Sequence, residues 1–84
     1  MSNDPHGSPV PGAPLAEWDA GMLGCGELVI ELRTRFVALP AGALFRLIAR
    51  DPGVPEDLPA WCRLTGHRLV SAEPPVFLLQ RKSP

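Results

Sequence analysis

The hexapeptide Leu23-Gly24-Cys25-Gly26-Glu27-Leu28 lies where the chain changes from a predicted strand to a predicted helix. Residues 15–19 form the candidate strand, and Gly21 and Gly24 allow a tight loop after it. A thiol at a helix N-terminus meets unpaired backbone N–H groups and the positive end of the helix dipole, which favour the thiolate. Because the thiolate is the nucleophile, Cys25 is the first candidate for chemistry in this chain.

A helical period begins at Gly26. Apolar residues then recur at the i, i+3 and i+7 spacing of one helix face, namely Val29, Leu32 and Phe36, with Leu28 and Leu39 widening the stripe. The opposite face is polar, and its spacing predicts an ion pair between Glu31 and Arg35. The sequence Pro-Ala-Gly at residues 40–42 ends this helix.

The second half of the chain holds one more predicted helix and three more predicted strands. Residues 43–49 are a mostly apolar run typical of a strand near the middle of a sheet, and residues 50–53 break it. Residues 56–65 form the helix, which has an apolar face, a proline near its first turn and a glycine cap: Leu58, Trp61, Cys62, Pro59 and Gly66. Residues 67–72 and 76–81 form two strands joined by an irregular hairpin turn.

The predicted order of elements is therefore β-α-β-α-β-β. This order favours the α/β class, and within it an α+β two-layer sandwich, in which a mixed four-stranded sheet carries both helices on one face. The other face of the sheet stays at least partly exposed and is a candidate partner surface. Residues 1–14 form a Pro- and Gly-rich segment that we expect to be a disordered tail, and residues 15–82 form a single folded domain.

Composition limits the functions open to this chain. Its 84 residues suffice for one small domain, and a hydrophobic content of 45% is too high for a disordered protein. A formal net charge of −1 argues against nucleic-acid binding as the main task and gives no reason to expect a role at an anionic membrane. The sequence shows neither a membrane span nor a secretory signal, so we expect a cytoplasmic location.

The cysteines and histidines are too scattered for a metal site with zinc spacing, and two cysteines are too few for a disulfide framework. Cys62 shares an apolar helix face with Trp61, which favours a packing role. Whether Cys62 can approach Cys25 closely enough for a disulfide stays open. His67 begins a predicted strand and is either a proton carrier or a surface or satisfied polar residue.

Asp19 precedes the loop before Cys25, where a carboxylate can accept backbone N–H bonds and shape the turn that presents the thiol. We expect Asp51 to act in the same way before the second helix. Trp18 and Trp61 are predicted core residues. A set of arginines forms either a docking surface for an acidic partner or, as the simpler interpretation, a solvated helix face: Arg33, Arg35, Arg50 and Arg63.

At these spacings the chain resembles the TusA-like, also called SirA-like, family of sulfur carriers and sulfurtransferases. The family signature is a Cys-Pro-x-Pro motif that opens the first helix, with an aspartate six residues before the cysteine. Asp19 and Cys25 have this spacing, and Glu27 occupies the x position. Further matches are Gly42, Asp51-Pro52, residues 57–62 against Asp-Ile-Pro-x-aromatic-Cys, and His67-x-Leu69, so that the resemblance covers about residues 17–82.

Both signature prolines are replaced in this chain, by Gly26 and Leu28. Proline at the first helical position fixes φ without losing a hydrogen bond, whereas glycine there costs roughly 0.5–1 kcal/mol of ordering. The loss of both prolines affects the rigidity of the backbone around Cys25. It also affects recognition by any partner that contacts the prolines.

The resemblance implies a carrier that holds sulfane sulfur as a persulfide on Cys25, with Asp19, Glu27 and Asp51 in support. Glu27 places a like charge near a thiolate, although its own carboxylate benefits from the helix dipole. The resemblance further implies no metal or organic cofactor, a desulfurase-like donor protein and an acceptor protein, and we expect a monomer. The alternative, motivated by the missing prolines, is a non-catalytic binding or regulatory module that keeps the fold and has lost sulfur transfer.

Overall fold

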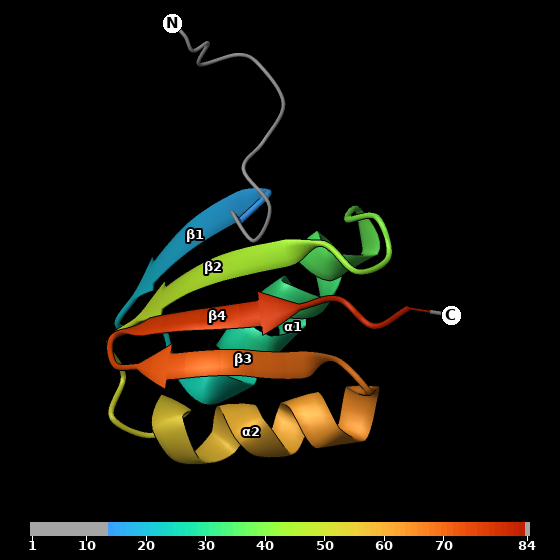
Figure 1. The fold of residues 1–84 in the computed structure, drawn as a ribbon. Coiled ribbons are helices and arrows are strands. Elements are labelled where there is room, and N and C mark those ends of the chain that lie inside the picture. The colour runs from blue at the N-terminus through green and yellow to red at the C-terminus, as the bar shows by residue number, and fades with distance from the viewer. Residues whose placement is uncertain (1–13, 84) are drawn as a thin grey trace, which may run out of the picture.

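In the computed structural model the chain is described from residue 14 to residue 83, so the predicted tail lies outside the described residues apart from Pro14. Within this range, helices and strands follow one another in the predicted order (Figure 1). Their bounds are β1 Ala16–Gly21, α1 Cys25–Val37, β2 Leu44–Ala49, α2 Val54–Thr65, β3 Arg68–Glu73 and β4 Val76–Gln80.

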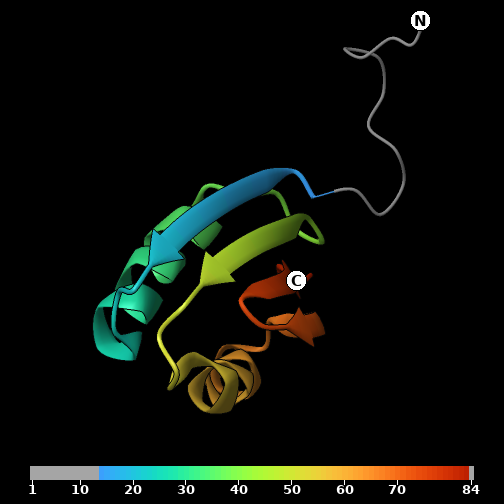
Figure 2. The same ribbon diagram turned by 90° about the vertical axis from the view of Figure 1, so that its left-hand side faces the viewer.

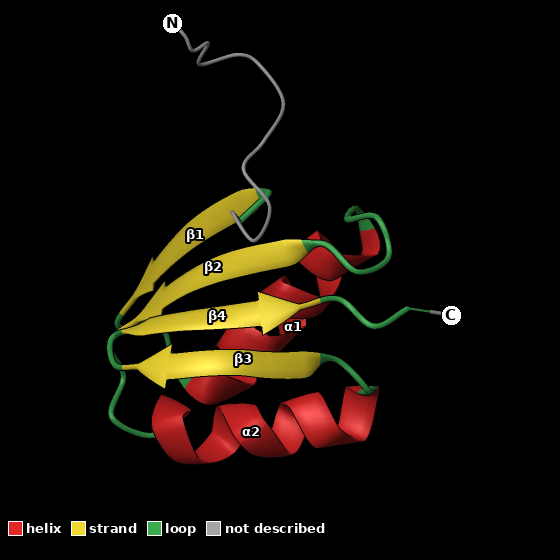
Figure 3. Cartoon of the chain, viewed as in Figure 1, coloured by secondary structure: helices red, strands yellow, loops and turns green. Residues whose placement is uncertain are grey.

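The strands form one mixed sheet in the order β1-β2-β4-β3. β1 pairs with β2 in parallel, whereas β4 lies between β2 and β3 and pairs antiparallel with both. β1, β2 and β3 therefore run in one direction, and each helix connects two of them. Both helices cover the same face of the sheet (Figures 2 and 3), which confirms the predicted two-layer sandwich.

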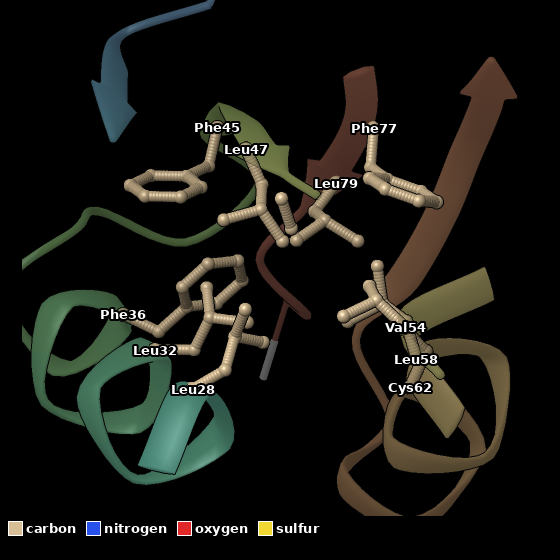
Figure 4. Close-up of a cluster of buried hydrophobic side chains, with 11 residues drawn as sticks. Leu28, Leu32, Phe36, Phe45, Leu47, Val54, Leu58, Cys62, Phe77 and Leu79 are labelled. Carbon is tan, nitrogen blue, oxygen red and sulfur yellow. The ribbon is translucent and has the colours of Figure 1, made fainter. Parts of the chain in front are cut away.

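The core fills the space between the sheet and the two helices (Figure 4). α1 contributes Leu28, Leu32 and Phe36, and Phe36 packs on Phe45 of β2 with ring centroids 5.2 Å apart. The remaining buried side chains come from β2, α2 and β4, namely Leu47, Ala49, Val54, Leu58, Cys62, Phe77 and Leu79. Burial of this apolar surface holds the helices on the sheet.

The buried stripe of α1 differs from the predicted one. The sequence places Val29 in the stripe, but Val29 is only partly buried while Leu28 is completely buried. Leu28, Leu32 and Phe36 form an i, i+4, i+8 row that contacts the sheet along the whole helix, and Val29 falls at the edge of this row.

Both ends of α2 are defined by the local sequence. The helix begins at Val54 rather than at the predicted Glu56, because Pro55 in the first turn gives up an N–H that would have no helical partner there. The Val54 N–H donates to the backbone carbonyl oxygen of Asp51 at 3.1 Å. Gly66 ends the helix as predicted, with a φ of 85°, and its N–H donates to the Cys62 carbonyl oxygen at 2.9 Å.

Neither tryptophan belongs to the buried core, so that prediction is wrong. Trp18 and Trp61 are partly buried and pack against the core from its margin. The guanidinium of Arg35 lies 4.5 Å from the Trp18 ring centroid and also pairs with Glu31 at 3.0 Å, which confirms the predicted ion pair. A small domain offers little space in which a whole indole can be enclosed.

The parallel direction of β1 and β2 brings the starts of both helices to one end of the molecule (Figure 1). α1 follows the end of β1, and α2 follows the end of β2. Cys25 and the first turn of α2 therefore lie at the same edge of the sheet. Neither helix within residues 14–83 is long and apolar enough to cross a membrane.

We expect Leu32→Ala to lower the free energy of unfolding by about 2–5 kcal/mol, because it removes a completely buried side chain and leaves a cavity between α1 and the sheet. Ile30→Ala on the same helix is the matched control, since Ile30 is 69% exposed and its loss should change stability by about 0.5 kcal/mol or less. Urea unfolding followed by far-UV circular dichroism measures both values. Equal effects of the two substitutions would contradict the described packing of α1.

Candidate functional site

The loop that leads from β1 to Cys25 is fixed by Asp19. Its Oδ1 accepts hydrogen bonds from the Gly21 N–H and from Arg50 Nη1, each at 2.9 Å. The Arg50 backbone N–H in turn donates to the Gly21 carbonyl oxygen at 2.8 Å. Gly21 has a φ of 58°, which suits glycine, and the strand pairing is irregular between Asp19 and Gly21. The expected contact of Asp19 with backbone N–H groups is therefore present, and an ion pair to Arg50 adds to it.

Cys25 is the first residue of α1, one residue earlier than the predicted helix start. The cap residue Gly24 is extended and makes no side-chain cap, and its carbonyl oxygen accepts the first helical bond, from the Leu28 N–H at 2.8 Å. The N–H groups of Cys25, Gly26 and Glu27 thus have no helical acceptor. A Cβ placed on Gly24 or Gly26 would meet no atom within 4 Å, so the backbone on both sides of Cys25 is open.

The environment of Cys25 raises the pKa of its thiol, so the net preference for the thiolate expected from the helix N-terminus is absent. Partial burial is the largest cause. A hydrogen bond to the side chain of Asp57 and the negative charges of Asp57 and Asp51 act in the same direction. At neutral pH the Cys25 side chain is therefore held as the protonated thiol.

The two acidic residues that act on Cys25 lie at the start of α2. Asp51 Oδ2 accepts a hydrogen bond from the Gly53 N–H at 3.0 Å, as expected for a carboxylate that shapes this turn. A Cβ on Gly53 would lie 3.2 Å from Asp51 Oδ2 and 3.6 Å from Asp57 Oδ2, so both carboxylates flank this glycine. The sequence interpretation missed Asp57 as a site residue. The signal that could have found it is the parallel βα pattern, which brings the first turns of both helices to one edge.

The charge of Glu27 is not among the causes that raise the pKa of the Cys25 thiol. The charges that raise the pKa of the Cys25 thiol belong to Asp57 and Asp51. Glu27 is exposed and lines a shallow hollow of about 380 Å³ on the outer side of α1, together with Leu23, Ile30 and Glu31. Two exposed apolar side chains, Met22 and Ile30, precede and follow the thiol along the chain.

The other candidate residues lie apart from this edge or serve in packing. Cys62 is 4% exposed, and burial raises the pKa of its thiol to about 11, as expected for a core residue. Both Cys25 and Cys62 are free thiols. His67 is a satisfied polar residue, because its Nδ1 accepts a hydrogen bond from the Lys82 N–H at 3.0 Å. In the part of the chain that the structure describes, no three His, Cys, Asp or Glu side chains gather as metal ligands would.

The fold and this site together define a small two-layer α/β protein with a partly exposed thiol on the first residue of its first helix. A family model described as sulfurtransferase TusA matches residues 17–79. Since this match covers most of the chain, the protein belongs to the TusA family.

Curated relatives agree with this assignment. The chain is 43% identical over 72 residues to the sulfur carrier protein TusA of Pseudomonas syringae pv. syringae (strain B728a), covering 81% of this chain and 86% of that one. It is 40% identical over 60 residues to the protein of the same name from Pseudomonas putida (strain W619), covering 71% and 75%. Pseudomonas savastanoi pv. phaseolicola has a relative of the same name that is 43% identical over 65 residues, covering 74% and 77%.

We expect Asp57→Asn to lower the pKa of Cys25 and to speed its alkylation at neutral pH, because the substitution removes the negative charge that raises this pKa most. The measurement is the pH dependence of the alkylation rate in a Cys62→Ala background, where Cys25 is the only thiol. Without the Asp57 substitution the midpoint should lie above the ordinary thiol value of about 8.5. Glu27→Gln is the control and should leave the midpoint unchanged. A midpoint below neutrality before substitution would contradict the described environment.

Proposed function

We propose that this protein is a sulfur carrier in which Cys25 accepts a sulfane sulfur as a persulfide and passes it to a second protein. The observation that supports this role most directly is the position of Cys25, a free and partly exposed thiol on an open helix start in a member of the TusA family. The sulfur carriers named above share this family and cover most of the chain. Residues 15–82 would form the unit that performs the transfer.

The proposed transfer is an exchange between sulfur atoms with no net oxidation. The Cys25 thiol first loses its proton, and the thiolate attacks the outer sulfur of a persulfide on the donor. A new S–S bond forms on Cys25 while the S–S bond of the donor breaks, and the donor cysteine leaves as a thiolate that takes up a proton. Delivery repeats these steps with the acceptor's nucleophile attacking the outer sulfur on Cys25.

The raised pKa of Cys25 fits a carrier whose thiol is unreactive while no partner protein is bound. A protonated thiol reacts slowly with the oxidants and electrophiles of its surroundings. The Asp57 side chain contributes to this raised pKa through its hydrogen-bonding group and its negative charge. Asp19 acts at a distance from the sulfur, by holding the Gly21 turn through which the chain reaches Cys25.

The partners implied by this role are a desulfurase-like donor protein and an acceptor protein. We propose that the carrier works as a monomer in the cytoplasm. Met22, before the thiol, and Ile30, on α1, are exposed apolar side chains that offer contact area for either partner. The replacement of both signature prolines, by Gly26 and Leu28, is the observation that favours the alternative, a binding module without transfer.

Incubation with a persulfide donor should add the mass of one sulfur atom to the intact protein. We expect Cys62→Ala to keep this adduct, since that thiol is buried, and Cys25→Ala to lose it completely. Intact-mass spectrometry measures both, with release of the adduct by a reducing agent as the control for a persulfide. An unmodified protein, or an adduct that survives in Cys25→Ala, would exclude the proposed role and leave the binding module.

A further inference from the structure

A second hollow lies where α1, α2 and the segment after β4 meet, at the opposite end of the helices from Cys25. Its volume is about 470 Å³, which is in the range of small-molecule sites. Phe36 is eleven residues after Cys25 on α1, which places this hollow about 16 Å along the helix from the thiol. The lining combines two aromatic rings, a histidine and three cationic side chains: Phe36, Trp61, His67, Arg33, Arg81 and Lys82.

The aromatic side chains form a connected wall. Phe36 meets Trp61 edge-on with ring centroids 5.7 Å apart, and the His67 ring lies 4.7 Å from Phe36 and 5.3 Å from Trp61. Because Phe36 is buried in the core, this wall is held in place from behind. It offers a fixed apolar surface on which a flat or aliphatic group can pack.

The charge of this hollow is positive and unbalanced. No lining residue is acidic. The ion pairs within residues 14–83 involve Arg35, Arg46 and Arg50, and not Arg33, Arg81 or Lys82. The Nε of Arg81 is buried and has no hydrogen-bond partner among the described residues. A buried charged donor without an acceptor is costly, and a carboxylate can accept two parallel N–H bonds from one guanidinium.

The pKa of His67 reflects the same positive local charge. Burial is the largest cause that lowers the pKa of His67, and the charges of Lys82 and Arg81 lower it further. The neutral ring accepts from the Lys82 N–H at Nδ1 and therefore carries its own proton at Nε2. Its remaining polar atom is thus a donor, like those of the neighbouring cations.

We propose that this hollow binds a small organic carboxylate with an aromatic or aliphatic body. The carboxylate would pair with Arg81 and Lys82, and the body would pack on the Trp61 ring, which Phe36 supports from the core side. The volume of about 470 Å³ and the aromatic wall favour a small molecule over an acidic protein segment. This site lies apart from Cys25, and the proposal does not depend on the sulfur-carrier role of that residue.

Benzoate and phenylacetate are the probes, and ¹H–¹⁵N NMR of the full chain is the measurement. We expect saturable shifts of amides in α1, α2 and residues 81–82, and none with the neutral analogue benzyl alcohol. Formate, which has the charge without the body, should bind at least about tenfold more weakly. We also expect saturating benzoate to raise the pKa of His67, because the bound charge offsets Arg81 and Lys82.

Arg81→Gln and Lys82→Gln should each raise the dissociation constant for benzoate about tenfold or more. Lys82 is exposed, so its substitution tests the site even where loss of Arg81 disturbs folding. Arg68→Gln is the matched control and should leave the affinity unchanged, since Arg68 is exposed on β3 and does not line the hollow. Equal binding of formate and benzoate, no binding of either probe, or binding of a short acidic peptide in place of both would overturn the proposal.

Discussion

The parallel pairing of β1 with β2 is the constraint on which the rest of this structure depends. Two strands that run side by side in one direction must be joined by a connection that returns across the sheet, and here that connection is α1. Each helix then begins at the edge where its strand ends. The thiol on the first residue of α1 consequently shares one edge with the carboxylates of Asp51, just before α2, and Asp57, in its first turn, although more than twenty residues separate them in the chain.

This arrangement sets two opposing influences on the thiol. The open N-terminus of α1 favours the thiolate, whereas partial burial and the charges of Asp57 and Asp51 favour the thiol. Burial and the two carboxylates outweigh the helix N-terminus, so the pKa of the thiol is raised. In the proposed transfer, a docked group that neutralises or excludes the two carboxylates would lower the pKa of the Cys25 thiol. Reactivity would then follow docking instead of being constant.

Much of the fold follows from local pattern, and the exceptions have physical causes. Apolar spacing and the glycine at position 66 predict the elements and the end of α2, since these depend on neighbouring residues alone. The start of α2 at Val54 is missed because a proline that looks like a break is suited to a first turn. The position of Cys25 at a helix start is likewise local. Its contact with Asp57 is not, because it depends on how two βα units lie beside each other in the sheet.

The central claim is that Cys25 both accepts and releases sulfur, and release from loaded protein tests it most directly. Protein loaded with sulfane sulfur is freed of donor and treated with cyanide, which removes sulfane sulfur as thiocyanate. Tandem mass spectrometry of the peptides before and after treatment locates the sulfur. The account predicts one sulfur atom per chain on the peptide that contains Cys25, and its recovery as thiocyanate. Sulfur located on Cys62, or sulfur on Cys25 that cyanide does not remove, would contradict it.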